Sequence, residues 1–175
     1  MPFFAEAAVS ALKAVPLVNS SVEGDKIIIK KSINRGMAVA APSGLFVPVI
    51  KDAEGKDFLA IACAINDLAI RTRTKRLMPE EIQGGTFTIS NYGIFGNVIG
   101  SPIINQPQVA ILGVGAATKR PVVVTDSQGS DSVAIRSMVY LTLAFDHRVI
   151  DGALGGQFLA KVVSHLEQYD LSKVF

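Results

Sequence analysis

Residues 146–152 combine two carboxylates, one imidazole and one guanidinium within seven positions. They follow an apolar run, 138–145, that predicts a buried strand, and precede 153–169, where apolar residues recur at helical spacing. Loops at the end of a core strand often carry functional groups, so His147 is a candidate acid–base group. The alternative is an ordinary helix entry, with Asp151 as the N-cap and His147 as a turn residue, because short motifs are weak signals.

Composition limits the classes of function. The chain has 175 residues, enough for one domain with a substantial core. Hydrophobic residues make up 49% and charged residues 18%, which indicates that other subunits cover part of the surface. The net charge is only +2, and like charges form no block. Binding to nucleic acid or to a membrane surface is therefore not expected.

Targeting and redox signals are few. No run of 18 apolar residues suggests a membrane span, and no signal-peptide pattern follows Met1. Cys63 is the one cysteine, so no internal disulfide is expected, and its place in a helical pattern predicts an inert core thiol. Histidine and cysteine spacings predict no metal site, and His165 is expected to pack or to face solvent.

Helices and strands are expected to form a mixed α/β layered domain. Helical patterns cover 3–15 and the segment after the N-cap candidate Asp57. The abrupt start of the first helix suggests a piece of a longer domain. Strands are expected at 26–30, 36–41, 45–50, 86–90, 109–115, 121–125 and 132–137, with Pro48 marking an edge or a bulge.

Several of these segments match one known family. The chain resembles the catalytic core of the dihydrolipoamide acyltransferase component of 2-oxo acid dehydrogenase complexes. The motifs carrying the resemblance occur in the order of the family and cover nearly the whole chain: 42–50, 84–91, 102–107, 110–113 and 146–152.

The resemblance implies a chloramphenicol acetyltransferase-like fold, a mixed sheet with flanking helices. It implies homotrimers that build a larger hollow core with dehydrogenase and dihydrolipoamide dehydrogenase partners, in bacterial cytoplasm or the mitochondrial matrix. On this basis residues 1–175 form an acyltransferase catalytic domain that lacks an N-terminal strand and helix. The lipoyl group would be carried on another domain, and the partner-binding domain is also absent from this chain.

The reaction implied is transfer of an acyl group from dihydrolipoamide to coenzyme A. A free thiol titrates near ~8.5, so a nearby base is needed at neutral pH, and His147 matches the general base of the family. Ser90 matches the donor to the oxyanion, offered by a neighbouring subunit. Asp151 would steady the imidazolium or the loop, and Asn91 and Gly115 match positions near coenzyme A.

Two alternatives remain at this stage. A small-molecule O-acetyltransferase of the same fold usually has a second histidine directly before the catalytic one, where this chain has Asp146. A non-catalytic core scaffold would need none of His147, Asp151 and Ser90. The sequence leaves acetyl, succinyl and branched-chain acyl groups all open.

Overall fold

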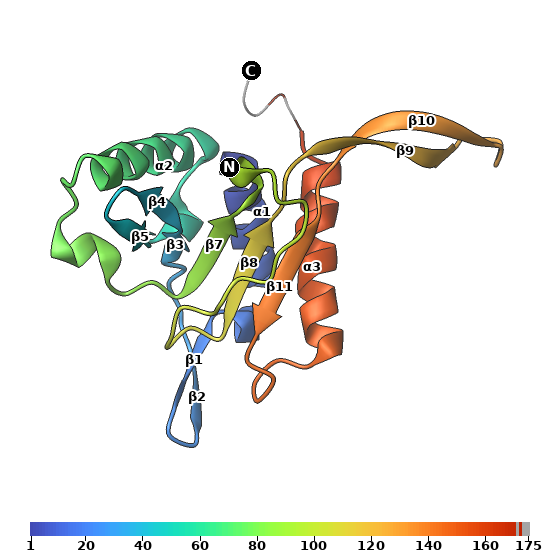
Figure 1. Ribbon diagram of the computed structural model, residues 1–175. Coiled ribbons are helices and arrows are strands. Elements are labelled where there is room, and N and C mark those ends of the chain that lie inside the picture. The colour runs from blue at the N-terminus through green and yellow to red at the C-terminus, as the bar shows by residue number, and fades with distance from the viewer. Residues whose placement is uncertain (171, 173–175) are drawn as a thin grey trace.

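The centre of the protein is a five-stranded mixed sheet. The computed structural model describes residues 1–170 and 172, and Figure 1 shows the arrangement. The strands follow the order β11-β8-β7-β3-β6. β3, β7 and β8 run parallel, and the edge strands β11 and β6 run antiparallel to their neighbours. Their bounds are Arg35–Met37 (β3), Val49–Ile50 (β6), Phe87–Asn91 (β7), Ala110–Val114 (β8) and Leu141–Phe145 (β11).

Three α-helices are formed within the described residues: α1 (Pro2–Ala14), α2 (Phe58–Arg73) and α3 (Gly152–Glu167). α1 and α3 pack side by side against one face of the sheet (Figure 1). The side chain of Asp57 caps α2 by accepting a hydrogen bond from the Ala60 amide at 2.7 Å, as predicted. The periodic apolar residues of the sequence therefore locate all three helices to within a few positions.

Alternation along β7 divides the core from the opposite face of the sheet. Phe87 and Ile89 are fully buried and point toward the helices. The Phe87 ring lies 5.5 Å from the Phe158 ring of α3. Thr88 and Ser90 must then point to the opposite face, which the chain between β7 and β8 crosses (Figure 1). This alternation places the hydroxyl groups of β7 away from the apolar core.

Three hairpins extend from this core. They pair β1 (Ser20–Glu23) with β2 (Lys26–Ile29), β4 (Val39–Ala41) with β5 (Gly44–Phe46), and β9 (Thr118–Thr125) with β10 (Asp131–Met138). The β9–β10 hairpin is an arm that leaves the body of the molecule (Figure 1). The predicted hairpin of 36–50 is present but divided, because β3 and β6 join the central sheet.

The expected strand 138–145 is wrong in one respect. Met138 ends β10, β11 starts only at Leu141, and every residue of β11 is half-buried rather than buried. The apolar run 138–145 therefore contains the last residue of β10, at the base of the arm, and the whole of the edge strand β11. β11 is only half-buried because an edge strand is covered on fewer sides than a central one.

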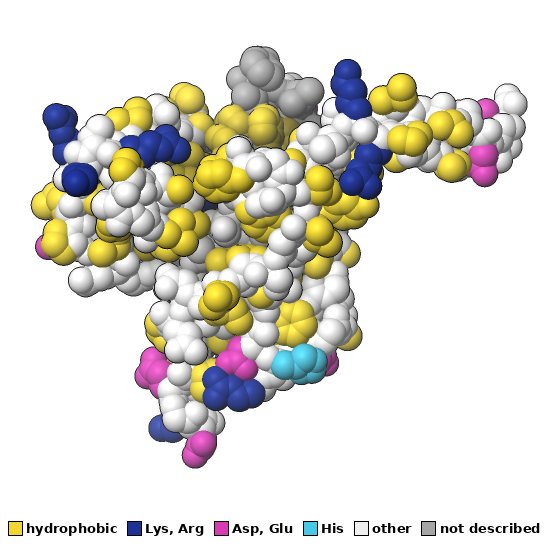
Figure 2. Space-filling view, viewed as in Figure 1, with side chains coloured by type: hydrophobic (Ala, Val, Ile, Leu, Met, Phe, Trp, Pro, Cys, Tyr) yellow, Lys and Arg dark blue, Asp and Glu magenta, His cyan; other side chains and the backbone are white. Residues whose placement is uncertain are grey.

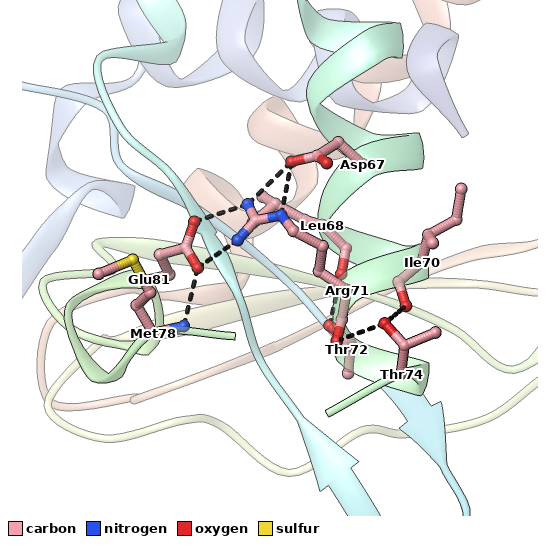
Figure 3. A network of polar contacts seen from close by, with 8 residues as sticks. All are labelled: Asp67, Leu68, Ile70, Arg71, Thr72, Thr74, Met78 and Glu81. Carbon is pink, nitrogen blue, oxygen red and sulfur yellow. Dashed lines mark hydrogen bonds and ion pairs between the residues drawn. The ribbon is translucent and has the colours of Figure 1, made fainter. Parts of the chain in front are cut away.

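Ion pairs fix the C-terminal end of α2 to the next turn (Figure 3). The guanidinium of Arg71 donates to both carboxylate oxygens of Glu81, and its Nε donates to Asp67 at 2.9 Å. Glu81 also accepts from the Met78 amide at 2.9 Å. The hydrogen bond from Arg71 holds the pKa of Glu81 below its ordinary value. This basic helix end therefore has a structural role.

The prediction that Cys63 is a core thiol is wrong. Its side chain is exposed on the outer face of α2, whereas the buried positions of that helix are Ile61, Ile65, Leu68 and Thr72. The helical periodicity was correct, but the buried stripe is narrower than the apolar pattern suggests.

Candidate active site

The turn after β11 is organised by Asp146. Its amide donates to the carbonyl of Val109 at 2.8 Å, and its own carbonyl accepts from the amides of Val149 and Ile150 at 3.0 Å. Its carboxylate accepts from Arg148 through the backbone amide, Nε and one terminal nitrogen, at 2.6–3.1 Å. These hydrogen bonds from Arg148 lower the pKa of Asp146, so the carboxylate stays charged and the turn stays closed.

His147 projects from this turn into solvent. The residue is exposed, and its ring lies 5.7 Å from the ring of Phe145 at a tilt of 43°. Together with Leu17, Asp151, Leu154 and other residues it lines an open hollow of about 390 Å³. Within residues 1–170 and 172 the imidazole makes no hydrogen bond, so both ring nitrogens are available to a ligand.

Close packing of α3 on β11 sets the position of the His147 turn. Gly155 of α3 is buried, and a Cβ atom there would lie 2.8 Å from the Phe145 ring. Only glycine permits this approach, and the Phe145 ring in turn supports the imidazole. The scaffold beneath the candidate base is therefore rigid.

Asp151 caps α3. Its Oδ1 accepts from the Leu154 amide at 2.7 Å, and its carbonyl accepts from the Gly155 amide at 3.0 Å. In the described part of the chain no hydrogen bond joins Asp151 to His147. The two residues share one hollow, but the contact that the structure shows for Asp151 is the helix cap.

Ser90 belongs to a row of four hydroxyl-bearing residues at every second position: Thr86, Thr88, Ser90 and Tyr92. Three of the hydroxyls are engaged: Thr86 with the backbone of Asn34, Thr88 with the side chain of Gln108, and Tyr92 with the Gly100 carbonyl and Thr142. The hydroxyl of Ser90, which is half-buried, has no hydrogen-bond partner among the described residues. It is the member of the row that remains available to a ligand.

Ser90 and His147 do not meet within one chain. Ser90 pairs with Gly113 of β8, which pairs with Thr142 of β11. His147 is five residues past Thr142 and lies beyond the end of β11 at Phe145, so about 10 Å or more separates Ser90 from His147 along the strand direction. One chain therefore carries two half-sites at opposite ends of its sheet.

Asn91 and Gly115 lie close to Ser90, but local contacts occupy both. The side chain of Asn91 accepts from the Gly93 amide at 3.0 Å and donates toward the sulfur of Met1 at 3.3 Å. A Cβ atom at Gly115 would lie 2.0 Å from the Val98 carbonyl oxygen. Both residues thus shape the loop next to Ser90.

Sequence reasoning missed Tyr92, Thr142 and Arg35. The alternating hydroxyls of 86–92 were a usable signal for the first, since they share one face of a predicted strand. Arg35 gave no signal. It is fully buried on β3, and its three guanidinium nitrogens have no hydrogen-bond partner in the described structure.

Residues 1–170 and 172 contain neither a metal-binding cluster nor a membrane-spanning helix. No group of three histidine, cysteine, aspartate or glutamate residues lies close enough to hold a metal ion there. None of the described helices is long and apolar enough to cross a membrane.

Comparison with known families and curated proteins gives one consistent result. The family model for the catalytic domain of 2-oxoacid dehydrogenases acyltransferase matches residues 1–173. The lipoamide acyltransferase component of the Bacillus subtilis branched-chain alpha-keto acid dehydrogenase complex is 48% identical over 96% of this chain. The acetyltransferase component of the Corynebacterium glutamicum pyruvate dehydrogenase complex is 47% identical over 95%. The chain spans only 39% and 25% of those two proteins.

Solved structures agree with this. A probable dihydrolipoamide acetyltransferase from Listeria monocytogenes matches with a TM-score of 0.90 and 44% identity, over 95% of this chain and 69% of that one. The Azotobacter vinelandii dihydrolipoamide acetyltransferase matches with a TM-score of 0.88 and 35% identity, over 99% of this chain and 70% of that one. That protein was studied for the catalytic roles of a serine, a histidine and an asparagine. The cubic core of the pyruvate dehydrogenase complex matches with a TM-score of 0.88 and 36% identity, over 99% of this chain and 70% of that one.

A chloramphenicol acetyltransferase is more distant. It matches with a TM-score of 0.54 and 16% sequence identity, over 94% of this chain and 76% of that one. It confirms the expected fold class alone.

Proposed function

The chain belongs to the family of catalytic domains of 2-oxoacid dehydrogenase acyltransferases, and we propose that it transfers an acyl group from dihydrolipoamide to coenzyme A. The observation that carries the proposal is the exposed imidazole of His147, with both nitrogens unengaged by described residues, on a turn held closed by Asp146 and Arg148. A base that must meet a mobile thiol needs this combination of access and fixed position.

The chemistry follows from thiol and thioester reactivity. His147 takes the proton from the coenzyme A thiol as the sulfur attacks the carbonyl carbon of the thioester. The new carbon–sulfur bond creates a tetrahedral oxyanion. Collapse of this intermediate breaks the bond to the dihydrolipoamide sulfur, which takes the proton from the imidazolium. Direct exchange between the two thiols needs no covalent enzyme intermediate.

Ser90 donates a hydrogen bond to the oxyanion. This role is supported by the hydroxyl of Ser90, which has no hydrogen-bond partner among the described residues, whereas the neighbouring hydroxyls of Thr88 and Tyr92 are already bound. A donor fixed in advance stabilises the developing charge without reorganising, and losing such a donor typically costs about 10²–10³ in rate.

A second copy of the chain completes the site, because the two half-sites are at opposite ends of one sheet. We place Ser90 of one subunit opposite His147 of the next, in a homotrimer. The arm supports such an assembly: apolar side chains gather on it (Figure 2), and Val123, Val133 and Ile135 are about 70% exposed. The likeness to a cubic core supports further assembly of the trimers.

Asp151 fixes the turn that carries His147. The Azotobacter vinelandii protein has its studied asparagine four residues after its histidine, the spacing of Asp151 from His147. Asparagine and aspartate both cap helices, so a capping role suits either residue. We assign Asn91 and Gly115 to the wall of the coenzyme A site, through the shape that they give to the loop beside Ser90.

The wider setting follows the named relatives. They are components of complexes, from bacteria and, in Schizosaccharomyces pombe, from a mitochondrial complex. We propose that the chain acts in such a complex, in the bacterial cytoplasm or the mitochondrial matrix. It would receive its acyl group from a lipoyl group on another domain and work with dehydrogenase and dihydrolipoamide dehydrogenase components.

The test is an acyl-transfer assay with acetyl, succinyl and isobutyryl dihydrolipoamide as donors. The expected result is turnover with coenzyme A that collapses in His147→Ala, and the best donor identifies the acyl group. His165→Ala is the matched control and is expected to keep activity. A folded, assembled chain without any turnover would instead support a core scaffold.

A further inference from the structure

Tyr92 lies in a slot formed by two glycines. A Cβ atom at Gly113 would lie 2.8 Å from the Tyr92 ring, and one at Gly100 would lie 3.1 Å from it. Any larger side chain at Gly113 would also meet Thr142 Oγ1 at 2.3 Å. The ring therefore crosses β8 at the position of Gly113 and fills the space above it.

Hydrogen bonds hold the ring at its far end. The hydroxyl of Tyr92 lies 3.0 Å from the Gly100 carbonyl and 3.0 Å from Thr142 Oγ1, and Thr142 Oγ1 lies 2.8 Å from the same carbonyl. Each hydroxyl has one proton: both can donate to the Gly100 carbonyl, or Tyr92 can donate to Thr142 while Thr142 donates to Gly100. The side chain thus ties the end of β7 to β11 and to the loop 93–100.

Ser90 lies directly beside this clamp. It pairs with Gly113, the residue covered by the ring, and it precedes Tyr92 by two positions on the same face. On its other side, Thr88 is fixed by a 2.7 Å hydrogen bond to Gln108. The strand is therefore pinned on both sides of Ser90.

We infer that Tyr92 and Thr142 are positioning residues that hold the hydroxyl of Ser90 in the direction required by the oxyanion. The inference rests on the proposed function. The ring closes the space over Gly113 into which the Ser90 side chain could otherwise turn. Removing either clamp hydroxyl leaves the Gly100 carbonyl with one of its two hydrogen bonds, which loosens the clamp and widens the range of positions of Ser90. Small misplacements of catalytic groups lower rates steeply.

The experiment compares Tyr92→Phe, Thr142→Val and Thr142→Ser in the wild-type and Ser90→Ala backgrounds. In the wild type, Tyr92→Phe and Thr142→Val are expected to lower kcat on the order of tenfold with little change in KM, while Thr142→Ser keeps activity. In Ser90→Ala the same changes are expected to have no further effect, because they act through Ser90.

Tyr140→Phe is the matched control, since this tyrosine bonds Arg120 at the base of the arm instead. Equal losses in both backgrounds, or losses confined to KM, would overturn the inference. If Ser90→Ala itself has no effect, the proposed oxyanion role fails separately. Crystal structures of Tyr92→Phe and Thr142→Val give a readout independent of activity: the Ser90 side chain is expected to change direction, and an unchanged side chain would refute the clamp.

Discussion

Ser90 and His147 lie at opposite ends of one sheet, so the proposed mechanism, which uses both residues at one site, requires two chains. The pairing of Ser90 with Gly113, and of Gly113 with Thr142, fixes Ser90 level with the start of β11. His147 follows the end of the same strand. A reacting thioester must lie about 3 Å from both the base and the oxyanion donor, which these positions do not allow within one chain.

The first prediction is therefore complementation between inactive chains. Ser90→Ala and His147→Ala are each expected to lose activity by about 10² or more. Mixed trimers formed by unfolding and reassembling the two variants together are expected to regain up to about a quarter of the wild-type activity, since that fraction of random interfaces pairs two intact residues. The acyl-transfer assay measures it.

Two control samples make this test specific. Each variant unfolded and reassembled alone is the control and is expected to stay inactive. If the mixture also stays inactive although mixed trimers form, the site does not lie between Ser90 of one chain and His147 of another.

The second prediction concerns Asp151. Because its carboxylate caps α3, Asp151→Ala is expected to cost about 1 kcal/mol of stability, which lowers the Tm by about 2–4 °C. Asp151→Asn keeps the cap and is expected to keep both the Tm and most of the activity. Thermal unfolding and the acyl-transfer assay together measure both effects. A large loss of activity in Asp151→Asn at unchanged Tm would show that the negative charge itself acts in catalysis.

The third prediction concerns the arm. Ile135→Lys and Val133→Lys place charges on its exposed apolar face and are expected to weaken association between copies, because a lysine is costly to bury without a partner. Light scattering measures the molar mass. Activity is expected to fall in parallel. Ser132→Lys, also on β10, is a control at a position that is already polar and exposed. Trimers that survive both apolar substitutions would exclude the arm from the interface.

Local patterns in the sequence predicted the helices and most strands. Apolar spacing located α1, α2 and α3, and the cap residues Asp57 and Asp151 marked two of their starts. These features depend on neighbours along the chain. The exposure of Cys63 was predicted wrongly because burial depends on how much of α2 other elements cover.

The candidate site was predictable in part. The cluster of 146–152 and its place after a strand gave His147 and the cap, and the family resemblance gave Ser90. The clamp was not predictable, because Tyr92, Gly100, Gly113 and Thr142 come from four segments whose register no local pattern fixes. The distance between Ser90 and His147 in one chain also depends on register, although the family resemblance already implied that a neighbouring subunit offers Ser90.

The fourth prediction is a pH dependence of stability. Glu81 is paired with Arg71, and its pKa is lowered from the ordinary 4.5. A lowered pKa in the folded state adds stability above about pH 4.5, and this stability is lost as the pH falls through the folded pKa. Glu81→Gln is therefore expected to lower the Tm by at most a few degrees at pH 7, and by less as the pH falls below 4.5. Thermal unfolding between pH 3 and pH 7 measures this.

Glu80→Gln, at an exposed neighbouring position, is the control and is expected to show no such pH trend. If Glu81→Gln lowered the Tm equally at all pH values, the ion pair would be excluded as the cause.

The fifth prediction is that removing a buried charge stabilises the protein. Arg35 is fully buried, and desolvation lowers its pKa to about 10. A lowering of this size corresponds to about 3 kcal/mol of cost to the charged form at neutral pH. Arg35→Met keeps an unbranched apolar stem without the charge, so the Tm is expected to rise by about 5–10 °C.

The pH dependence has a definite sign. Folding disfavours the charged form of Arg35, so the stability of the wild type rises toward that of the variant only when the pH exceeds about 10. The difference in Tm between the two proteins is expected to be constant between pH 6 and 9. Arg136→Met, at an exposed position on the arm, is the control and is expected to leave the Tm unchanged. A less stable Arg35→Met would mean that the guanidinium has a stabilising partner in the assembled protein, and a rise in Tm would show that this part of the core tolerates a charge at a cost in stability.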